Sequence, residues 1–507
     1  MKHIYLEKGK TFLLCFSFSF FFLMICTKSS FLYPMNNWTD ANCFFTIGKS
    51  ALEGKVYYLD LFDQKGPLLY FYHTIAAIIS YDSFLGVFLI EVLSFSFFLY
   101  YTYQLLTLYL KKTTTYYLLP IISFLILTLP AFSHGDSAEE FCLPFLMYSL
   151  YSMIKFFKSN QITPSYQMIF TNGIMAGLVF TIKYSMLGFW FAFMMSFFFL
   201  MVKEKAYKKA IISCFIFLFG MALPFIPWLL YFLSHHALQA FYDAYIYFNI
   251  FLYPSTTPLL LRFFMIISKP IKFFATNLGI GIPFVIGCIY LWFTPTILKK
   301  TIHKWILCST FFFLCFSVFF GGISFRYYPL ILTPFLVFGI IGIALLIEEK
   351  YLLIYSKNWD ARLIIMTTIC LGFSYYGSSN TSMMYPKTMK EDLVQYQFAK
   401  IITQTKNPTL LNYHFLDGGF HLTTKTIPVA KYFQKQNIPD TVFPDIKQEQ
   451  DKLIKEKKVD FVITRTKINR YESFEYPKEL KKNYREVDRK NETYEENRFR
   501  YILWQKK

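Results

Sequence analysis

The sequence lacks the short motifs that mark common nucleotide and metal sites. It contains no P-loop, no GxGxxG and no HExxH, and the adjacent His235 and His236 have no further metal-ligand spacing. None of its 9 cysteines lies after Cys370 and none belongs to a CxxC pair, so the sequence indicates neither a disulfide framework nor a cysteine metal site. Any activated substrate must therefore be recognised without a nucleotide-binding motif.

Apolar residues dominate the chain instead. With 55% hydrophobic residues and 62 phenylalanines among 507 positions, it has more apolar surface than one water-soluble core could bury. About eleven apolar segments reach the length of a bilayer span, which predicts an all-α polytopic membrane protein. No small-x-small cleavage site follows the first segment, so we interpret it as an uncleaved span. The segments are 11–32, 84–110, 115–133, 141–157, 166–183, 185–202, 210–233, 275–298, 304–320, 328–347 and 361–377.

Basic residues set the predicted topology. The net charge of +19 is spread over short Lys and Arg clusters between apolar segments, as the positive-inside rule requires, so we expect the bilayer and no nucleic acid as partner. The apolar stretch 67–81 would reach only about 22 Å as a helix, against a hydrocarbon core of about 30 Å, which predicts a surface-lying or re-entrant helix. The N-terminus and the lysine clusters then lie in the cytoplasm. The loops 33–83, 134–140, 234–258 and 321–328 lie outside the cell membrane, as does everything after about 378.

Two further patterns in the membrane part concern helix packing and the membrane surface. Segment 259–274 mixes apolar residues with three basic ones and is interrupted by Pro270, which suits a second juxtamembrane helix on the exoplasmic side. Gly173 and Gly177 form a GxxxG pair, which predicts the close approach of a neighbouring helix.

The composition turns polar after about residue 378, where we expect the membrane domain (1–377) to end. Strand-like runs occur around 408–416 and 459–466, and the charged run 445–458 between them predicts a helix. A hairpin is predicted at the end of the chain. This order indicates a small exoplasmic α/β domain over 378–507.

The first exoplasmic loop, 33–83, holds Asp40, Asp60, Asp63 and Lys65 at the membrane surface. Charged groups there must be solvated, paired or bound to ligand charge. Asp40 could be a general base for an acceptor hydroxyl, or the N-cap of the following helix. Lys65 could bind a lipid phosphate, or only anchor the short apolar helix by snorkelling.

A second group of charges lies in other loops of the same expected face. Asp136, Glu139 and Glu140 crowd the loop after the third span, and Lys183 and Arg326 end other spans. The acids could serve an acceptor and the cations a phosphate. Alternatively, these residues only anchor helix ends at the membrane boundary, as charged residues do in most membrane proteins.

The residues around these positions form a familiar pattern. The run from Asp40 through GKSALEGKVYYLDLFDQKGPLLYF, then GDSAEEFCLPF and FRYYPLILTPF, resembles bacterial GT-C type membrane glycosyltransferases of the protein O-mannosyltransferase and lipid A aminoarabinose transferase superfamily. The similarity covers roughly residues 1–350. The later LLNYHFLDGGF and VDFVITR look like the appended exoplasmic domain of some Gram-positive members.

The resemblance implies a polyprenyl-phosphate sugar donor and roles for particular residues. Asp40 corresponds to the first-loop acid that acts as base or orients the acceptor, and Lys65 to the lysine that meets the donor phosphate. The pair Glu139 and Glu140 falls at the second acidic position, and Arg326 at a late cation near the phosphate. Many relatives have an acidic pair in the first loop, whereas here Ala41 follows Asp40. The sequence therefore leaves open whether a divalent metal is needed.

Taken together, these patterns predict a membrane glycosyltransferase that moves a sugar from a polyprenyl-phosphate carrier to an extracellular glycan or lipid acceptor. Cations would stabilise the leaving phosphate and a carboxylate would activate the acceptor hydroxyl. Two alternatives stay open. A transporter or flippase of lipid-linked sugars would tend to show inverted repeats, which the sequence lacks. A non-catalytic scaffold would tolerate replacement of Asp40.

Overall fold

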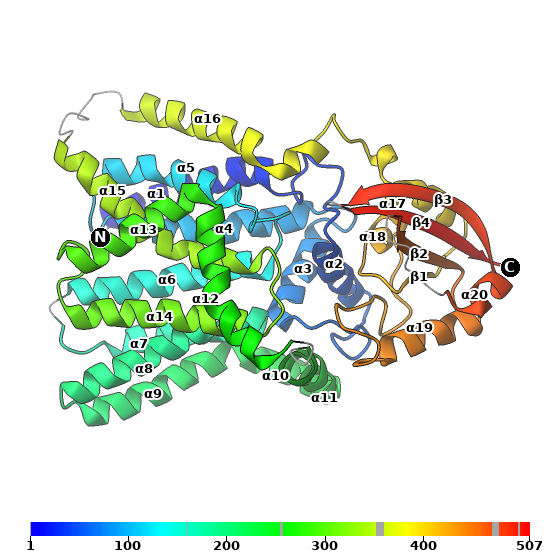
Figure 1. Ribbon diagram of the computed structural model, residues 1–507, viewed down its shortest axis with the longest axis horizontal. Coiled ribbons are helices and arrows are strands. Elements are labelled where there is room, and N and C mark those ends of the chain that lie inside the picture. Colours follow the sequence, from blue (N-terminus) through cyan, green and yellow to red (C-terminus); the bar gives the residue numbers. More distant parts are fainter. Residues whose placement is uncertain (1, 160, 254–256, 351–358, 469–475, 495–496) are drawn as a thin grey trace. The chain divides into compact units, whose positions relative to one another are not determined.

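The computed structural model describes residues 2–507 apart from 160, 254–256, 351–358, 469–475 and 495–496 (Figure 1). The chain divides into two compact units. Unit 1 comprises Met1–Thr27, Phe88–Leu229 and Thr257–Thr381, and unit 2 comprises Lys28–Val87, Leu230–Thr256 and Ser382–Lys507. The first loop, 33–83, and the segment Leu230–Thr256 thus belong to the same unit as the C-terminal domain.

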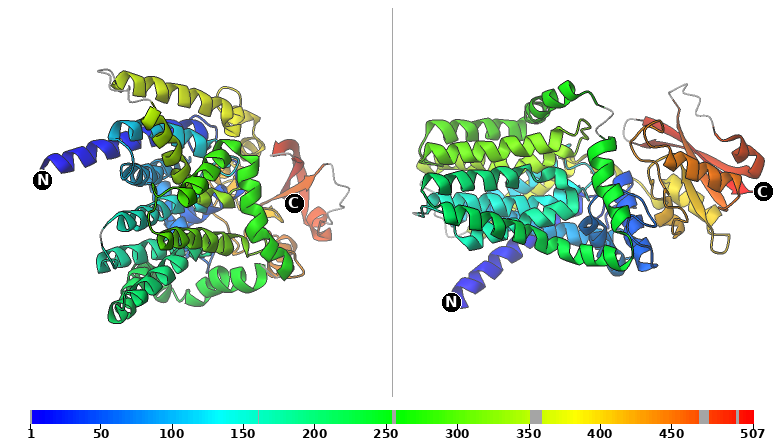
Figure 2. Two further views of the ribbon diagram at one scale, coloured as in Figure 1. Left: turned by 60° about the vertical axis from the view of Figure 1, so that its left-hand side comes forward. Right: turned by 90° about the horizontal axis from the view of Figure 1, so that it is seen from below.

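Unit 1 is a bundle of helices formed by the long apolar runs of the sequence. Most of its helices, among them α6, α7, α8, α9 and α14, run alongside one another, whereas α12 runs across them (Figure 1, Figure 2). Two of them have N-cap serines: the side chain of Ser137 accepts a hydrogen bond from Glu140 N, and that of Ser165 accepts one from Met168 N. The elements are α1 (Lys2–Cys26), α4 (Leu85–Leu106), α5 (Lys112–Leu127), α6 (Ala138–Lys158), α7 (Tyr166–Lys183), η1 (Tyr184–Met186), α8 (Gly188–Lys203), α9 (Tyr207–Ala222), η2 (Leu223–Phe225), α10 (Ile226–Ser234), α12 (Leu259–Thr276), α13 (Leu278–Phe293), α14 (Thr301–Phe319), η5 (Tyr328–Leu336), α15 (Val337–Lys350) and α16 (Trp359–Gly377).

The protein is a multi-pass membrane protein. Among the described residues, 5 helices are long and apolar enough to cross a membrane, or up to 7 if each sharply bent pair forms one span. The bent pairs are α7 with α8, at 119°, and α12 with α13, at 115°. The five are Glu7–Cys26, Leu85–Leu106, Tyr207–Ser234, Thr301–Phe319 and Tyr328–Ile347. The larger number of about eleven spans stays a prediction from the sequence.

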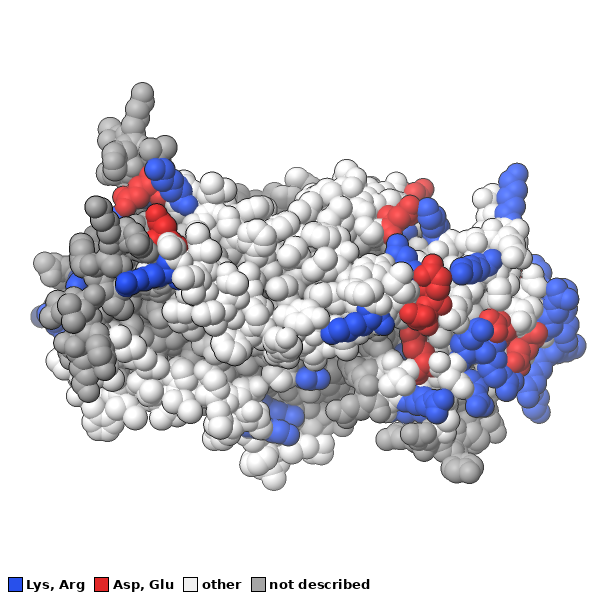
Figure 3. All heavy atoms as spheres, turned by 90° about the horizontal axis from the view of Figure 1, so that it is seen from above, with Lys and Arg blue, Asp and Glu red and all other residues white. Residues whose placement is uncertain are grey.

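The GxxxG pair packs as predicted. A Cβ atom built on Gly173 would lie 2.3 Å from the carbonyl oxygen of Phe217, and one on Gly177 would lie 2.3 Å from that of Met221. Only glycine therefore lets α7 approach α9 this closely. The opposite side of α9 exposes large apolar residues such as Phe215, as a lipid-facing helix does. Figure 3 shows one face on which the sides of the helices carry few charged groups.

Unit 2 begins with two short helices of the first loop. They are α2 (Thr39–Leu52) and α3 (Pro67–Ile79), the second of which has Pro67 in its first turn and only 13 residues. A Cβ on Gly48 would lie 2.5 Å from the backbone of His73, so the glycine lets α2 cross α3 closely. The segment α11 (Leu238–Phe241) and η3 (Tyr242–Leu252) completes this part of the unit.

The C-terminal part of unit 2 is the small α/β domain that the sequence predicts. Its sheet has the order β1-β2-β4-β3, with β1 and β2 parallel and the other pairs antiparallel. The predicted strands, the helix between them and the final hairpin are confirmed, although residues 495–496 of the hairpin turn lie outside the described part. The elements are η6 (Ser379–Met383), η7 (Lys390–Asp392), α17 (Val394–Ile402), β1 (Leu410–Tyr413), α18 (Phe420–Thr424), α19 (Asp445–Lys455), β2 (Phe461–Lys467), α20 (Lys478–Asn483), β3 (Tyr484–Tyr494) and β4 (Asn497–Lys506).

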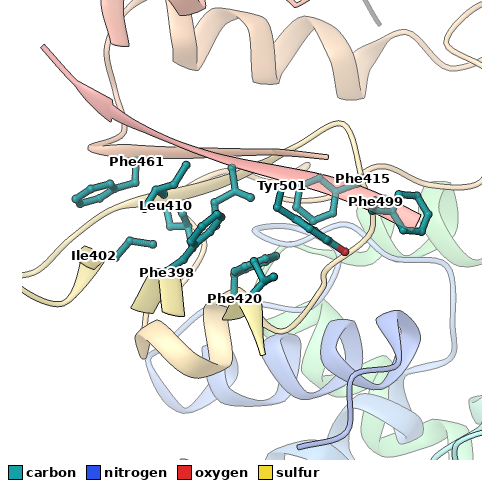
Figure 4. Packing of buried hydrophobic residues seen from close by; sticks show 11 residues of the cluster. Phe398, Ile402, Leu410, Phe415, Phe420, Phe461, Phe499 and Tyr501 are labelled. Atoms are coloured by element: carbon teal, nitrogen blue, oxygen red, sulfur yellow. The ribbon is translucent and has the colours of Figure 1, made fainter. Parts of the chain in front are cut away.

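Alternating side chains of this sheet form two apolar cores. Leu410 and Phe461 face α17 and α18, where they pack with Phe398 and Phe420 (Figure 4). The neighbouring strand residues face the other way, against Ile454 of α19 and Leu480 of α20. The period of two in the strands thus buries both faces of the sheet.

Candidate active site

Asp40 lies in the first turn of α2 with its side chain half-buried. The helix begins at Thr39, its N-cap residue is Trp38, and no side chain caps it. The alternative interpretation of Asp40 as the N-cap is therefore wrong, although an acid in the first turn still favours the helix dipole. Asn42 Nδ2 donates to the carbonyl oxygens of Asn36, at 2.8 Å, and Trp38, at 2.7 Å. These bonds fix the backbone from which Asp40 projects.

Lys65 precedes Gly66, the N-cap residue of α3, and its backbone is held from both sides. Its N–H donates to the hydroxyl of Tyr70 at 2.9 Å, and its carbonyl accepts from the hydroxyl of Tyr58 at 2.6 Å. Both tyrosines are buried, and Lys65 is only 9% exposed. The side chain of this lysine therefore starts from a fixed point in the loop.

The two other carboxylates of the loop bind groups of the protein. Asp60 Oδ2 accepts from the N–H of Val56 at 2.7 Å and closes a local turn. The buried Asp63 accepts from Tyr70 OH at 2.7 Å with one oxygen and from Gln436 Nε2 at 3.0 Å with the other. Asp60 therefore shapes the loop locally, whereas Asp63 connects it to the C-terminal domain.

A buried polar layer joins α2 to the C-terminal domain. Thr46 Oγ1 donates to Asp417 Oδ2 at 2.6 Å. One turn further, Lys49 is 2% exposed, and its Nζ has no hydrogen-bond partner among the described residues. The ammonium lies 4.3 Å from the centre of the Tyr81 ring. Burial lowers the pKa of Lys49 to about 8, against the opposing effect of the neighbouring Asp82.

In unit 1, the second acidic position and one of the predicted cations, Lys183, come together. Glu139, in the first turn of α6, forms an ion pair with Lys183, the last residue of α7. The Lys183 ammonium also lies 3.6 Å from the centre of the Tyr328 ring, just after the exposed Arg326. Glu139 is fully buried, and its Oε2 has no hydrogen-bond partner among the described residues. The structure therefore pairs Glu139 with Lys183, whereas Arg326 is an exposed residue two positions before Tyr328.

A second buried group of acids in unit 1 lies around the turn before α6. The N–H of Asp136 donates to Glu91 Oε1 at 2.8 Å and to Glu140 Oε2 at 3.0 Å. Thr27 Oγ1 donates to the same Glu91 oxygen at 2.9 Å. A Cβ on Gly135 would lie 2.0 Å from that threonine oxygen, and its φ of +85° also demands glycine. Glu140 is thus bound to the backbone of the turn.

The sequence-predicted residues are shared between the units. Asp40, Asp60, Asp63 and Lys65 belong to unit 2, whereas Glu139, Glu140, Lys183 and Arg326 belong to unit 1. Sequence reasoning missed Glu91, although a single acid inside the apolar run of α4 is itself a signal of a functional or buried pair. It also missed Gln436, for which no local signal exists.

The described residues do not fit a metal site. No group of three or more His, Cys, Asp or Glu side chains among them has a suitable arrangement for a metal ion. The amide nitrogen of Asp136 donates a hydrogen bond to one oxygen of Glu91 and to one oxygen of Glu140. We therefore derive no step through a divalent metal.

Comparison with known proteins decides the fold. No family model and no curated protein sequence matches the chain. The structure of ArnT from Cupriavidus metallidurans bound to undecaprenyl phosphate superimposes with a TM-score of 0.59, covering 99% of this chain and 98% of ArnT at 10% identity. ArnT in the apo state gives the same score, with 95% of each chain covered. The chain has the GT-C fold of ArnT.

The similarity to ArnT extends over both units. Because the superposition covers nearly the whole of both chains, the small C-terminal domain and the first loop are part of the shared architecture. At 10% identity the likeness concerns the fold, and the roles of individual side chains must be argued from their chemistry.

Proposed function

We propose that the protein is a membrane glycosyltransferase that transfers a sugar from a polyprenyl-phosphate carrier to an extracellular acceptor. The observation that carries the proposal is the ArnT-like fold over 99% of the chain, because that ArnT structure is bound to undecaprenyl phosphate. The N-terminus lies in the cytoplasm and the C-terminal domain outside, which places the Lys and Arg clusters between spans on the cytoplasmic side. The acceptor is a cell-wall polysaccharide, a teichoic acid or a glycolipid.

In this reaction the carboxylate of Asp40 takes the proton of the acceptor hydroxyl. The acceptor oxygen attacks the anomeric carbon of the sugar, and the bond from that carbon to the phosphate oxygen breaks. The electron pair stays on the phosphate, which leaves as polyprenyl phosphate. A general base of this kind contributes about 10²- to 10⁴-fold to the rate. The half-buried side chain of Asp40, at the start of a fixed helix, suits this role.

Cations stabilise the charge that grows on the phosphate. Lys65 meets the donor phosphate from the loop before α3, where its backbone is fixed by two buried tyrosines. Arg326 and Lys183 are further cations proposed for the phosphate, and Lys183 is paired with Glu139 and lies against the Tyr328 ring. Glu139 and Glu140 form the second acidic position of the site. Because such cations are already in position, they stabilise the negative charge that develops on the leaving phosphate without a costly rearrangement of the protein.

Turnover by the purified protein tests the proposal. The protein is incubated with a panel of synthetic undecaprenyl-phosphate sugars and acceptors, and released undecaprenyl phosphate is measured by mass spectrometry. We expect Asp40→Asn to reduce release by about 10²- to 10⁴-fold. Asp243→Asn, which changes an exposed acid of η3 in the same unit, is the control and keeps wild-type turnover.

Two outcomes would contradict the proposal. Near-normal turnover by Asp40→Asn would remove the base from this position. Transport of the lipid-linked sugar across vesicles, without release of the carrier lipid, would favour the transporter instead.

A further inference from the structure

A glutamine of the C-terminal domain reaches the first-loop lysine through a chain of hydrogen bonds. Gln436 Nε2 donates to Asp63 Oδ1 at 3.0 Å, and Tyr70 OH donates to Asp63 Oδ2 at 2.7 Å. The oxygen of Tyr70 accepts from the N–H of Lys65 at 2.9 Å. Gln436 is separated from Asp63 by 373 positions in the sequence. The chain therefore connects two distant parts of unit 2.

Every member of this chain is shielded from water. Gln436 is 3% exposed, Asp63 5% and Tyr70 1%. A buried polar group that loses its partner costs more than the hydrogen bond itself contributes, because water cannot replace the partner. A change at Gln436 therefore has to be absorbed by Asp63 and Tyr70, the groups that orient the N–H of Lys65.

The rest of the loop is fixed independently of Gln436. The N–H of Phe62 donates to the carbonyl oxygen of Lys431 at 2.9 Å, and the Phe62 ring stacks on that of Phe443. Asn249 Nδ2 of η3 donates to the carbonyl oxygen of Gln64 at 2.8 Å. The loop therefore stays in place when the bond between Gln436 and Asp63 is lost, and the effect is confined to the residues that follow.

We propose that Gln436 is a positioning residue that sets Lys65 for the donor phosphate through Asp63 and Tyr70. This inference rests on the proposed function, because it needs Lys65 to bind the phosphate. The hydrogen bond from Gln436 fixes the plane of the Asp63 carboxylate, whose other oxygen accepts the hydrogen bond of the Tyr70 hydroxyl, and Tyr70 then presents a lone pair to the N–H of Lys65. The C-terminal domain thus takes part in donor binding without touching the donor.

Binding of undecaprenyl phosphate to the full-length protein in detergent tests the inference. Gln436→Glu places a second carboxyl group against Asp63, and we expect about tenfold weaker binding, the effect of losing a buried hydrogen bond to a charged group. Gln436→Met removes the donor without adding charge and should weaken binding in the same direction. Gln448→Glu, an exposed glutamine on α19 of the same domain, is the matched control and should bind as the wild type does.

A reversed pair separates positioning from mere packing. In Gln436→Glu combined with Asp63→Asn, the amide of the new asparagine can donate to the new glutamate, and its oxygen can still accept from Tyr70. We expect this double variant to return to within about threefold of wild-type binding. Lys65→Ala is measured beside it and should bind at least about tenfold more weakly than the wild type.

The variants distinguish the two levels of the argument. If Lys65→Ala binds undecaprenyl phosphate normally, both the phosphate placement and the positioning role are wrong. If Lys65→Ala weakens binding but Gln436→Glu and Gln436→Met do not, only the positioning role is wrong. Loss of binding in Gln436→Glu without recovery in the double variant also overturns it, because the hydrogen-bond chain then does not explain the loss.

Discussion

The ion pair between Lys183 and Glu139 allows a quantitative test of the unit 1 cluster. In Lys183→Met the buried Glu139 loses its cation, and its Oε2 already has no hydrogen-bond partner among the described residues. Breaking a buried ion pair by removing one partner costs about 3–5 kcal/mol, since the remaining charge is uncompensated. We therefore expect a clear fall in the thermal unfolding temperature of the detergent-purified protein.

Removing both charges should be less harmful than removing one. In Glu139→Gln combined with Lys183→Met, no buried charge is left without a partner, so the unfolding temperature should return most of the way to the wild-type value. The two substitutions are then strongly non-additive, as expected for residues in contact. Lys203→Met, which changes an exposed lysine at the end of α8, serves as control and should change stability by about 0.5 kcal/mol or less.

The same proteins, together with Glu139→Gln alone to complete the double-mutant cycle, separate an ion pair from a phosphate ligand. If Lys183 binds the donor phosphate as well, the double variant should bind undecaprenyl phosphate as weakly as Lys183→Met does, although its stability has recovered. The reasoning on the ion pair is refuted if Lys183→Met unfolds at the wild-type temperature, or if the losses in stability simply add.

Two further predictions concern topology and pH. In a cysteine-free background, a cysteine at position 406 in the C-terminal domain should react with an impermeant maleimide on intact cells and one at position 205 should not; the reverse pattern would invert the topology. Because burial lowers the pKa of Lys49 from 10.5 to about 8, the unfolded state binds more protons between these values, so stability should rise with pH through about 8 to 10.5. Lys49→Met should lack this rise and unfold at a higher temperature at pH 7, whereas Lys55→Met should keep it; equal slopes for wild type and Lys49→Met would contradict the assignment.

Local patterns in the sequence predicted much of the fold. The apolar run around Leu410 and Leu411 predicted the strand β1, and the shortness of the apolar stretch 67–81 predicted a short helix such as α3. The GxxxG pair of Gly173 and Gly177 likewise predicted the close approach of a neighbouring helix, which is α9. These features depend on neighbours within a turn or a strand, so the sequence alone contains their physical cause.

Local sequence patterns predicted only part of the candidate site. Charges at the expected membrane surface marked Lys65, Asp63 and Glu139, but the partners that fix the first loop come from far along the chain. Gln436 and Asp417 lie in irregular segments of the C-terminal domain, and nothing around them indicates that they meet Asp63 and Thr46. Local patterns in a single sequence do not indicate such pairings, because the pairings arise from the packing of elements that are distant in the sequence. The N-cap interpretation of Asp40 failed for a smaller reason, since α2 begins at Thr39, two residues earlier than an Asp40 cap requires.

The grouping of the first loop with the C-terminal domain explains how a loop at a membrane surface can hold a defined geometry. Such a loop has few apolar neighbours of its own, and charged side chains there would otherwise sample many rotamers. In this chain the backbone of Phe62 is bound to Lys431 and the side chain of Thr46 to Asp417, so a domain with its own two-sided core supports the loop. Groups that must meet a reacting phosphate need positions fixed to about half an ångström, and rigid supporting elements supply them. Under the proposed function, the C-terminal domain would therefore belong to the catalytic structure, and the hydrogen bonds of Gln436 and Asp417 are the places where that dependence can be measured.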